Sequence, residues 1–468
     1  MGNIHIRMRK RRKSKESEAV AIISNVEHHQ PSSSIFNLIG HCIDELLEYL
    51  SLKDLHSLGQ TCRTMQCVTG KFFTRNYSAA KIVCESDGIY VIHLSHCNRI
   101  IERIPIPGFI QFITSVAIEG DLGPFKFIKL HANEFKLVKH LSLTNVCVSQ
   151  QTTNYIKKML DKIEILHLRH CSMHRNLYDV LLKYCTNIRK IYIQKNDNNK
   201  FHGQFKWLLR QYTTLEYLEL SLQRSIKIDE FRKFFKRNPN VRNFTCDSFV
   251  LWPNASLLLN STAKLDTFGL KYVGIPLIGN NSTTVKPLCN LLNRLHSQGF
   301  YERLHVNVFL SRELDFINGV EKIFIPRSNM VNSIDMLLSD LVEFTVAEVN
   351  ERFDRKMIEN LVNLERLYLE DGSADDILPF IQLTKKLNKI KLIPRVRKNW
   401  IHFEYEPMIL KLYPLNAERE KLAGARKVTI YVPDTVFLAT KWWSKNGVTN
   451  FSLIEMKRIG SYDWHLLR

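Results

Sequence analysis

The feature that most constrains the fold of this chain is a short apolar pattern that recurs about every 25 residues. Three apolar positions, written φ, follow the form φ-x-x-φ-x-φ, as in Ile163-x-x-Leu166-x-Leu168. Further copies open at Ile89, Ile113, Val138, Ile188, Leu215, Val241 and Leu265, and less evenly at Tyr301, Val320, Leu341, Leu364, Leu387, Ala425 and Val448. A single match arises easily by chance in a chain that is 45% hydrophobic, whereas a regular step does not. The step therefore indicates a repeat architecture.

Each copy has the pattern of a short strand whose alternate side chains point to the same side. Between the copies lie stretches with one apolar stripe, which is typical of helices. Such stripes are Tyr155, Ile156 and Met159; Leu177, Val180, Leu181 and Tyr184; Phe205, Leu208, Leu209 and Tyr212; and Phe231, Phe234 and Phe235. Strand and helix repeated at 20–29 residues are the signature of leucine-rich repeats. The predicted fold class is α/β, with a curved solenoid over residues 81–468 and a parallel sheet on its concave side.

Two stretches interrupt the repeats, near residues 274–300 and 393–426. The first contains a polar run from Gly279 to Thr284 and is predicted to be an exposed loop. The second is longer than one repeat and carries several aromatic residues, including Trp400. It is either an inserted element or a degenerate repeat, and the sequence leaves both interpretations open.

The chain carries a formal net charge of +20, part of which is concentrated near its beginning. Seven of the nine residues from Arg7 to Lys15 are basic, so a disordered basic tail is expected over residues 1–34. Such a cluster is compatible with a nuclear-localisation signal or with a solvated tail that has no targeting function. The cysteines include no CxxC pair, which favours a reducing compartment, and the expected localisation is nucleus and/or cytoplasm. No apolar run is long enough to span a membrane.

A small helical unit is predicted over residues 35–80. Ile43, Leu46, Leu47 and Leu50 have the spacing of one helix face. An S-x-x-D capping box at Ser51 starts a second helix, which carries Leu55, Leu58 and Cys62. A third helix is expected from Thr64 to Phe73. Short helices of this kind cannot bury both faces alone, so they need each other and a partner protein.

These residues resemble the F-box family. The stretch Leu46-Leu47-Glu48-Tyr49-Leu50-Ser51-Leu52-Lys53-Asp54-Leu55, followed by Gln60-Thr61-Cys62-Arg63, is similar to the family's leucine-rich helix, "L-S-L-x-D-L" corner and "V-C-R" segment. The family's Leu-Pro start aligns with Leu38-Ile39, and its tryptophan aligns with Met65. The alternative is an ordinary helical hairpin at the head of a larger domain.

The resemblance to F-box proteins with leucine-rich repeats implies the substrate-recruiting subunit of a Skp–cullin–F-box ubiquitin ligase. The residues that it implies for binding the Skp adaptor are Leu38, Leu46, Leu50, Leu52, Leu55 and Leu58. The F-box would connect the chain to Skp and the cullin, and the solenoid would hold a protein target. The alternative function is a nuclear leucine-rich-repeat scaffold that binds an acidic protein or nucleic acid without any ligase.

The target is expected on the concave face of the solenoid. On each φ-x-x-φ-x-φ strand, the residue before the second φ and the residue after it should point away from the core. In the N-terminal copies these residues are mixed, but in the C-terminal copies many are basic or aromatic. The predicted target-binding residues are Arg303, Lys322, Phe324, Arg366, Tyr368, Lys389 and Lys391. They would form a ridge for an acidic or phosphorylated segment, and the alternative is a solvated face without a partner.

No residue pattern in the chain predicts catalysis. His167, His170, Cys171 and His174 imitate the spacing of zinc ligands, but Cys171 is expected at a repeat turn and His167 on the opposite side of its strand. The chain has no P-loop, GxGxxG, GxSxG or HExxH motif. We therefore expect a non-catalytic adaptor without a cofactor or a metal. Membrane binding is not expected, and nucleic acid is an unlikely partner because no basic and aromatic platform is evident.

Overall fold

The computed structural model describes residues 42–43, 45–77, 79–85, 88–94, 101–105, 110–120, 122–173, 177–196, 205–222, 227–271, 286–307, 316–330, 338–394, 408–444 and 447–459. The expected basic tail at residues 1–34 and the proposed Skp contact Leu38 lie outside these ranges. The chain divides into two compact units, Met1–Leu50 and Ser51–Arg468, which are described separately. The division falls inside the predicted 35–80 unit.

In the first unit, residues from Cys42 to Leu47 include helical turns, and Leu47 is buried. The second unit begins with α3 (Leu52–Gly59) and α4 (Arg63–Tyr77), which pack against each other. The predicted cap of α3 is confirmed, because the Ser51 hydroxyl accepts a hydrogen bond from the backbone N–H of Asp54. The helix ends before Cys62, which was expected on it. The Cys62 sulfur instead accepts from the backbone N–H of Met65 at the start of α4.

The α4 helix is joined to the repeats by a close contact. A β-carbon at Gly70 would lie only 2.3 Å from the Phe112 ring, so the helix can approach η1 (Ile110–Phe112) only because this residue is glycine. The Thr74 hydroxyl also lies 3.4 Å from the carbonyl oxygen of Phe112, to which it donates. These contacts explain why α3 and α4 belong to the same compact unit as the repeats.

One sheet runs through the second unit. Within the described residues it has 17 strands, of which 15 are parallel. The parallel strands are, in spatial order, β1 (Ala79–Glu85), β4 (Ser115–Glu119), β5 (His140–Thr144), β7 (Ile165–Arg169), β9 (Lys190–Asn196), β10 (Tyr217–Leu222), β11 (Asn243–Asp247), β12 (Leu265–Lys271), β13 (Tyr301–Asn307), β14 (Val320–Arg327), β15 (Glu343–Glu348), β16 (Arg366–Gly372), β17 (Lys389–Pro394), β18 (Val428–Val432) and β19 (Ile454–Arg458). Two antiparallel strands, β2 (Gly88–Leu94) and β3 (Ile101–Pro105), extend it beyond β1. The predicted α/β class with a parallel sheet is thereby confirmed.

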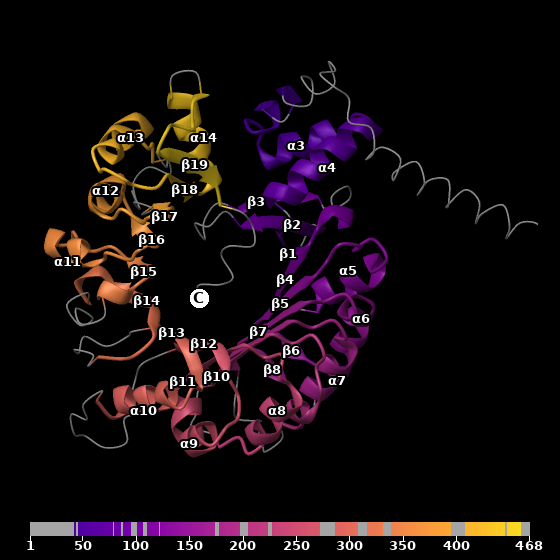
Figure 1. Cartoon of the computed structure of the whole chain (residues 1–468). Coiled ribbons are helices and arrows are strands. Elements are labelled where there is room, and N and C mark those ends of the chain that lie inside the picture. Colours follow the sequence, from indigo (N-terminus) through magenta and orange to yellow (C-terminus); the bar gives the residue numbers. More distant parts are fainter. Residues whose placement is uncertain are drawn as a thin grey trace, which may run out of the picture. The chain divides into compact units, whose positions relative to one another are not determined.

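Helical segments lie between most of these strands, on one side of the sheet (Figure 1). They are α5 (Gly123–His131), α6 (Gln150–Leu160), α7 (Leu177–Tyr184), η3 (Lys206–Leu209), α8 (Phe231–Arg237), α9 (Ser248–Leu259), α10 (Lys286–Ser297), α11 (Arg355–Asn360), α12 (Ala374–Leu383), α13 (Leu412–Glu420) and α14 (Asp434–Trp443). Short strands β6 (Cys147–Val148) and β8 (Ser172–Met173) form a separate pair. Within the described residues, no helix is both long and apolar enough to cross a bilayer.

The core lies between the sheet and the helices. The φ positions of successive repeats stack there, for example Leu141, Leu166 and Ile191, which pair in register and are fully buried. Further along, a group of phenylalanines fills the same layer, with Phe244 5.5 Å from Phe231 and 6.0 Å from Phe268 between ring centroids. Burial of such apolar side chains supplies the main stabilisation of each repeat against its neighbours.

Two predicted copies of the pattern are wrong, and a third is shifted. The copy at Ile89 lies in β2, which is antiparallel to β1 and belongs to no parallel repeat. The copy at Val448 places its apolar positions at Phe451 and Leu453, whereas the buried residues of β19 are Ile454 and Met456. The copy at Ala425 correctly predicts that Val428 and Ile430 are buried in β18, but Ile430 and not Val428 pairs with Ile390. A shift of two positions preserves the alternation of a strand, so the apolar pattern does not specify this pairing.

The two predicted interruptions contain regular structure. The α10 helix occupies much of the 274–300 stretch, of which residues 274–285 lie outside the described ranges. In the 393–426 stretch, α13 packs against α12 and is followed by β18, as in the other repeats. The described part of this stretch therefore completes a repeat, and residues 395–407 are outside the description.

Candidate recognition surface

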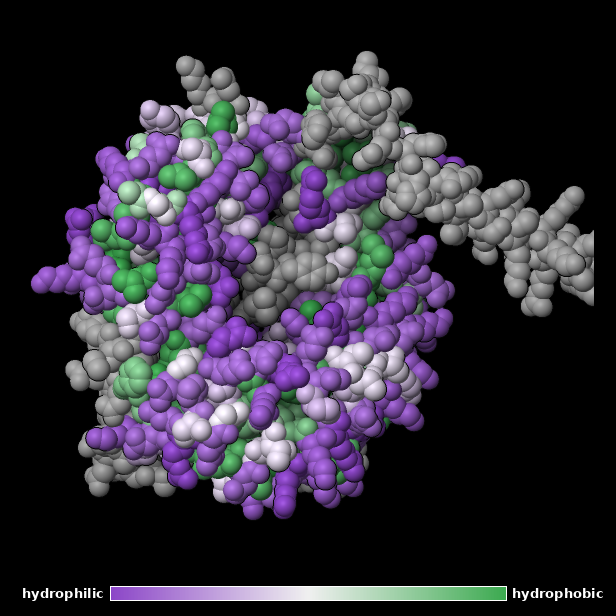
Figure 2. Space-filling view, in the orientation of Figure 1, coloured by the Kyte–Doolittle hydropathy of each residue, from purple (hydrophilic) through white to green (hydrophobic). Residues whose placement is uncertain are grey.

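The sheet has one face without described helices, which we call the open face. It carries the side chains that alternate with the buried φ positions, such as His167 between Leu166 and Leu168. Polar residues predominate on the visible side of the molecule, with scattered apolar patches (Figure 2). All seven predicted target-binding residues lie on strands of this sheet, β13, β14, β16 and β17.

Two carboxylates organise the open face over β13–β16. Glu321 lies 3.5 Å from an Arg303 guanidinium nitrogen, 3.3 Å from His305 Nε2 and 3.8 Å from an Arg366 nitrogen. Glu343 pairs with Lys322 and, at 2.9 Å, with Arg366 Nε. The hydrogen bond from His305 and the neighbouring cations lower the pKa of Glu321. We call Glu321, Glu343 and their cationic partners the carboxylate cluster.

The carboxylate cluster changes the interpretation of the predicted basic ridge. Arg303, Lys322 and Arg366 are each paired with a carboxylate of the same chain. The sequence pattern identified neither Glu321 nor Glu343 as a partner of these cations. His305, which contacts Glu321, lies beside Lys322 on the neighbouring strand because the register of β13 and β14 shifts after Leu304. No sequence pattern indicates this shift.

The cations at the C-terminal side of the ridge have a different environment. Lys389 is exposed, and its side chain has no ion pair or hydrogen bond with other described residues. The Lys391 ammonium lies 5.1 Å from the centroid of the Tyr368 ring, a cation–π geometry. Across the sheet, Lys391 pairs with Tyr431 of β18, which in turn pairs with Lys457 of β19. Phe324, the remaining predicted residue, is half-buried in β14.

An apolar cluster lies beside these lysines. It consists of Tyr368, Ile393 and Ile459, all nearly buried, with the half-buried ring of Tyr431 packed against it. Tyr431 and Lys457 were not predicted as site residues, because the repeats at Ala425 and Val448 were aligned in the wrong register. Alignment of Ile430 with both Ile390 and Met456 would have revealed them.

A second polar cluster lies on the open face over β7–β12. Glu219 is buried and accepts hydrogen bonds from Gln194 Nε2 at 2.5 Å and from Lys271 Nζ at 2.5 Å, and the Tyr217 hydroxyl lies 3.0 Å away. The rings of His167, Tyr192 and Tyr217 line the same face, with centroids 5.2 Å and 4.7 Å apart. Burial lowers the pKa of His167 and raises that of Tyr217. The carboxylate is satisfied within the chain, so this cluster has the properties of a structural network.

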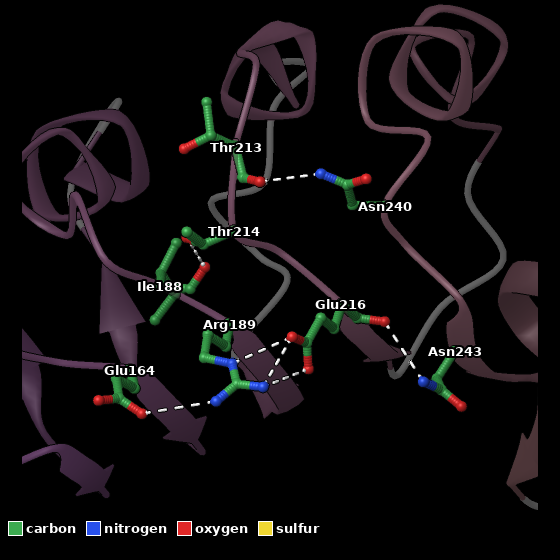
Figure 3. A network of polar contacts seen from close by, with 8 residues as sticks. All are labelled: Glu164, Ile188, Arg189, Thr213, Thr214, Glu216, Asn240 and Asn243. Carbon is green, nitrogen blue, oxygen red and sulfur yellow. Dashed lines mark hydrogen bonds and ion pairs between the residues drawn. The ribbon is translucent and has the colours of Figure 1, made fainter.

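A ladder of charges runs along the start of the strands (Figure 3). Arg189 lies 4.0 Å from Glu164 of the preceding repeat and makes two short contacts with Glu216 of the following one, at 2.7 and 3.0 Å. The bonds to Glu216 raise the pKa of Arg189. Main-chain oxygens are bonded as well, since Asn240 donates to Thr213 and Thr214 donates to Ile188. All of these contacts join neighbouring repeats, which indicates a role in stacking them in register.

The residues implied for Skp binding have different environments. Leu46 is 55% exposed, and Leu50 and Leu58 are half-buried. The Leu55 side chain is fully buried, so it packs within the chain and is not available to a partner. The helical position of Leu52, at the start of α3, is described, but its side chain is outside the description.

No protein-family model matches the chain, and no curated protein matches it. A solved structure that matches is a leucine-rich-repeat protein of Leptospira interrogans, with 12% sequence identity and a TM-score of 0.19. The match covers 62% of this chain and 86% of the other. The strand pairing of this chain, a long parallel sheet of strand–helix repeats, fits a leucine-rich-repeat solenoid.

Proposed function

We propose that the chain is the substrate-recruiting subunit of a Skp–cullin–F-box ubiquitin ligase. The observation that carries this proposal is the Ser51-capped corner with α3 and α4, at the position where the sequence resembles an F-box. Each unit has an accessible leucine in the stretch that resembles an F-box, since Leu46 of the first unit is 55% exposed and Leu58 of the second is half-buried. Exposed leucines on short helices favour a protein partner, because burying each one contributes roughly 1.5–3 kcal/mol.

In this function the chain acts by proximity and performs no chemistry. The helical corner binds the Skp adaptor, the solenoid holds a protein target, and a separate enzyme transfers ubiquitin. Holding both partners at once turns the encounter of target and enzyme into an intramolecular event with a high effective concentration. The open face of the sheet supplies the second surface that this mechanism needs.

The test is capture of purified Skp adaptor by the full-length chain. Leu46→Asp and Leu58→Asp should each weaken capture more than tenfold, because a carboxylate would have to be desolvated in the interface. Leu130→Asp is the matched control, since Leu130 is 80% exposed on α5, a helix outside the corner. Equal capture by all three variants, or no capture by the parent chain, would contradict the proposal.

The net charge of +20 favours a second candidate function, a scaffold that binds an acidic protein without a ligase. This function requires no contact through Leu46 or Leu58. Affinity purification distinguishes the two candidates, because Skp and cullin co-purify with a ligase subunit and are absent from such a scaffold.

A further inference from the structure

The charges on the open face are distributed unevenly between its two C-terminal parts. Over β13–β16, Arg303, Lys322 and Arg366 each pair with Glu321 or Glu343 of the carboxylate cluster. Over β17–β19, Lys389 has no ion pair with the described residues, and Lys457 lies 3.1 Å from Glu455. The described strands β17–β19 thus present Lys389, Lys391 and Lys457 but only one carboxylate, Glu455, at their open-face positions.

The spacing of these lysines matches an extended peptide. Lys391, Tyr431 and Lys457 occupy the same register on three neighbouring strands. Because parallel strands lie about 4.8 Å apart, the two lysines are separated by about 10 Å along the sheet. A polyproline II chain has three residues per turn and rises about 3.1 Å per residue, so every third side chain lies on the same side, about 9 Å apart. Acidic side chains three residues apart in such a peptide can thus reach both lysines.

Tyr431 lies between the two lysines in the strand pairing, and its ring is supported by neighbouring apolar side chains. Its ring packs against the buried cluster of Tyr368, Ile393 and Ile459, so one face is fixed while the side chain remains half-exposed. A ring that is already immobilised loses little conformational entropy when a ligand contacts it. Aromatic side chains next to cations are also common in the centres of protein interfaces.

We propose that the open face over β16–β19 binds an acidic segment of the recruited protein, with an aliphatic or aromatic side chain placed on Tyr431. Lys389, Lys391 and Lys457 contact the carboxylates of that segment. The proposal rests on the proposed function in that the segment belongs to the recruited target. It locates recognition at the last repeats and assigns Arg303, Lys322 and Arg366 to the carboxylate cluster instead.

The test uses a random-sequence peptide library selected on the immobilised full-length chain. The enriched peptides should contain Asp or Glu together with an apolar residue, and their binding should weaken as salt is raised. Synthetic labelled copies should bind Lys389→Glu/Lys391→Glu about tenfold or more weakly. Tyr431→Ala should reduce binding of these peptides but leave binding of copies without the apolar residue unchanged.

The matched control is Lys233→Glu/Lys356→Glu, which makes the same charge change on α8 and α11. It should bind the peptides like the parent chain. Failure to enrich acidic peptides, or equal loss of binding in both double variants, would overturn the proposal. Skp capture is measured on the same variants. Absent capture with intact peptide binding would reject the ligase function alone, and intact capture without acidic peptides would reject this surface alone.

Discussion

The ammonium group of Lys271 in β12 lies 2.5 Å from a carboxylate oxygen of Glu219 in β10, so this pair bridges the intervening strand β11. The Glu219 side chain is 2% exposed. Removing one partner of a buried pair leaves the other charge uncompensated, which costs about 3–5 kcal/mol. Lys271→Met should therefore lower the free energy of unfolding by about 3 kcal/mol, measured by chemical denaturation. The double variant Lys271→Met/Glu219→Gln should recover much of the loss, and additive losses would show that the two residues do not interact.

Arg419 in α13 has a structural role that can be tested directly. Its guanidinium is buried and donates to five main-chain carbonyl oxygens, those of Ile381, Thr384, Lys385, Leu387 and Arg426. Burial lowers the pKa of Arg419 to about 10, so it remains charged at neutral pH. Arg419→Met leaves several buried carbonyls unpaired and should destabilise the chain by about 3 kcal/mol or more in denaturation experiments.

The control for Arg419→Met is Arg426→Met. The Arg426 side chain is largely exposed and forms one ion pair with Glu365 at 2.9 Å. Exposed ion pairs contribute about 0–1 kcal/mol, so this variant should unfold close to the midpoint of the parent chain. Equal effects of the two substitutions would show that the main-chain bonds of Arg419 are not important for stability.

Asp247 predicts a pH dependence of stability. Its carboxylate caps α9 by accepting from the Val250 N–H at 3.0 Å, and burial raises the pKa of Asp247 to about 7. In the unfolded chain this carboxyl ionises near its ordinary pKa, so the unfolded state releases its proton first as pH rises. The free energy of unfolding is therefore highest below about pH 4, where Asp247 is protonated in both states. It falls as pH rises from about 4 to about 7, because only the unfolded chain loses this proton readily.

Asp247→Asn retains an oxygen that can cap the helix but removes the charge. The variant should be more stable than the parent chain at pH 8, by about 2–4 kcal/mol, and the difference should shrink toward pH 4. Denaturation midpoints measured between pH 4 and 8 check this expectation. A constant difference across that range would contradict the assignment of the titration to Asp247.

The carboxylate cluster predicts a gain of binding. Glu343→Gln removes the ion pair of Lys322 and the shorter of the two ion pairs of Arg366, and it extends the positive surface of β17 toward β14. The affinity for acidic peptides should rise several-fold at low salt and return toward that of the parent chain at high salt, since exposed charges are then screened. Fluorescence anisotropy with labelled acidic peptides measures the change. An unchanged affinity would place the bound peptide away from the cluster.

The sequence alone determined the repeat architecture over most of the chain. The copies from Ile113 to Leu387 all contribute strands to the parallel sheet, because their apolar positions recur at the step that stacks one strand on the next. The cap at Ser51 was also predicted correctly, since the bond between its side chain and the Asp54 N–H depends on residues three positions apart. Contacts between residues this close in sequence can be predicted without knowing the tertiary structure.

Only the tertiary structure decided which charges meet. The partners in the Glu219–Lys271 pair are 52 residues apart, and Glu321 reaches Arg366 from two strands away. These contacts depend on strand register and on the irregularity at Leu304, which the period-two alternation of a strand leaves undetermined. For the same reason only the strand pairing placed Tyr431 beside Lys391 and Lys457 beside Tyr431 on the open face. Apolar periodicity specifies which side chains are buried, whereas the pairing of neighbouring strands specifies which exposed side chains become neighbours.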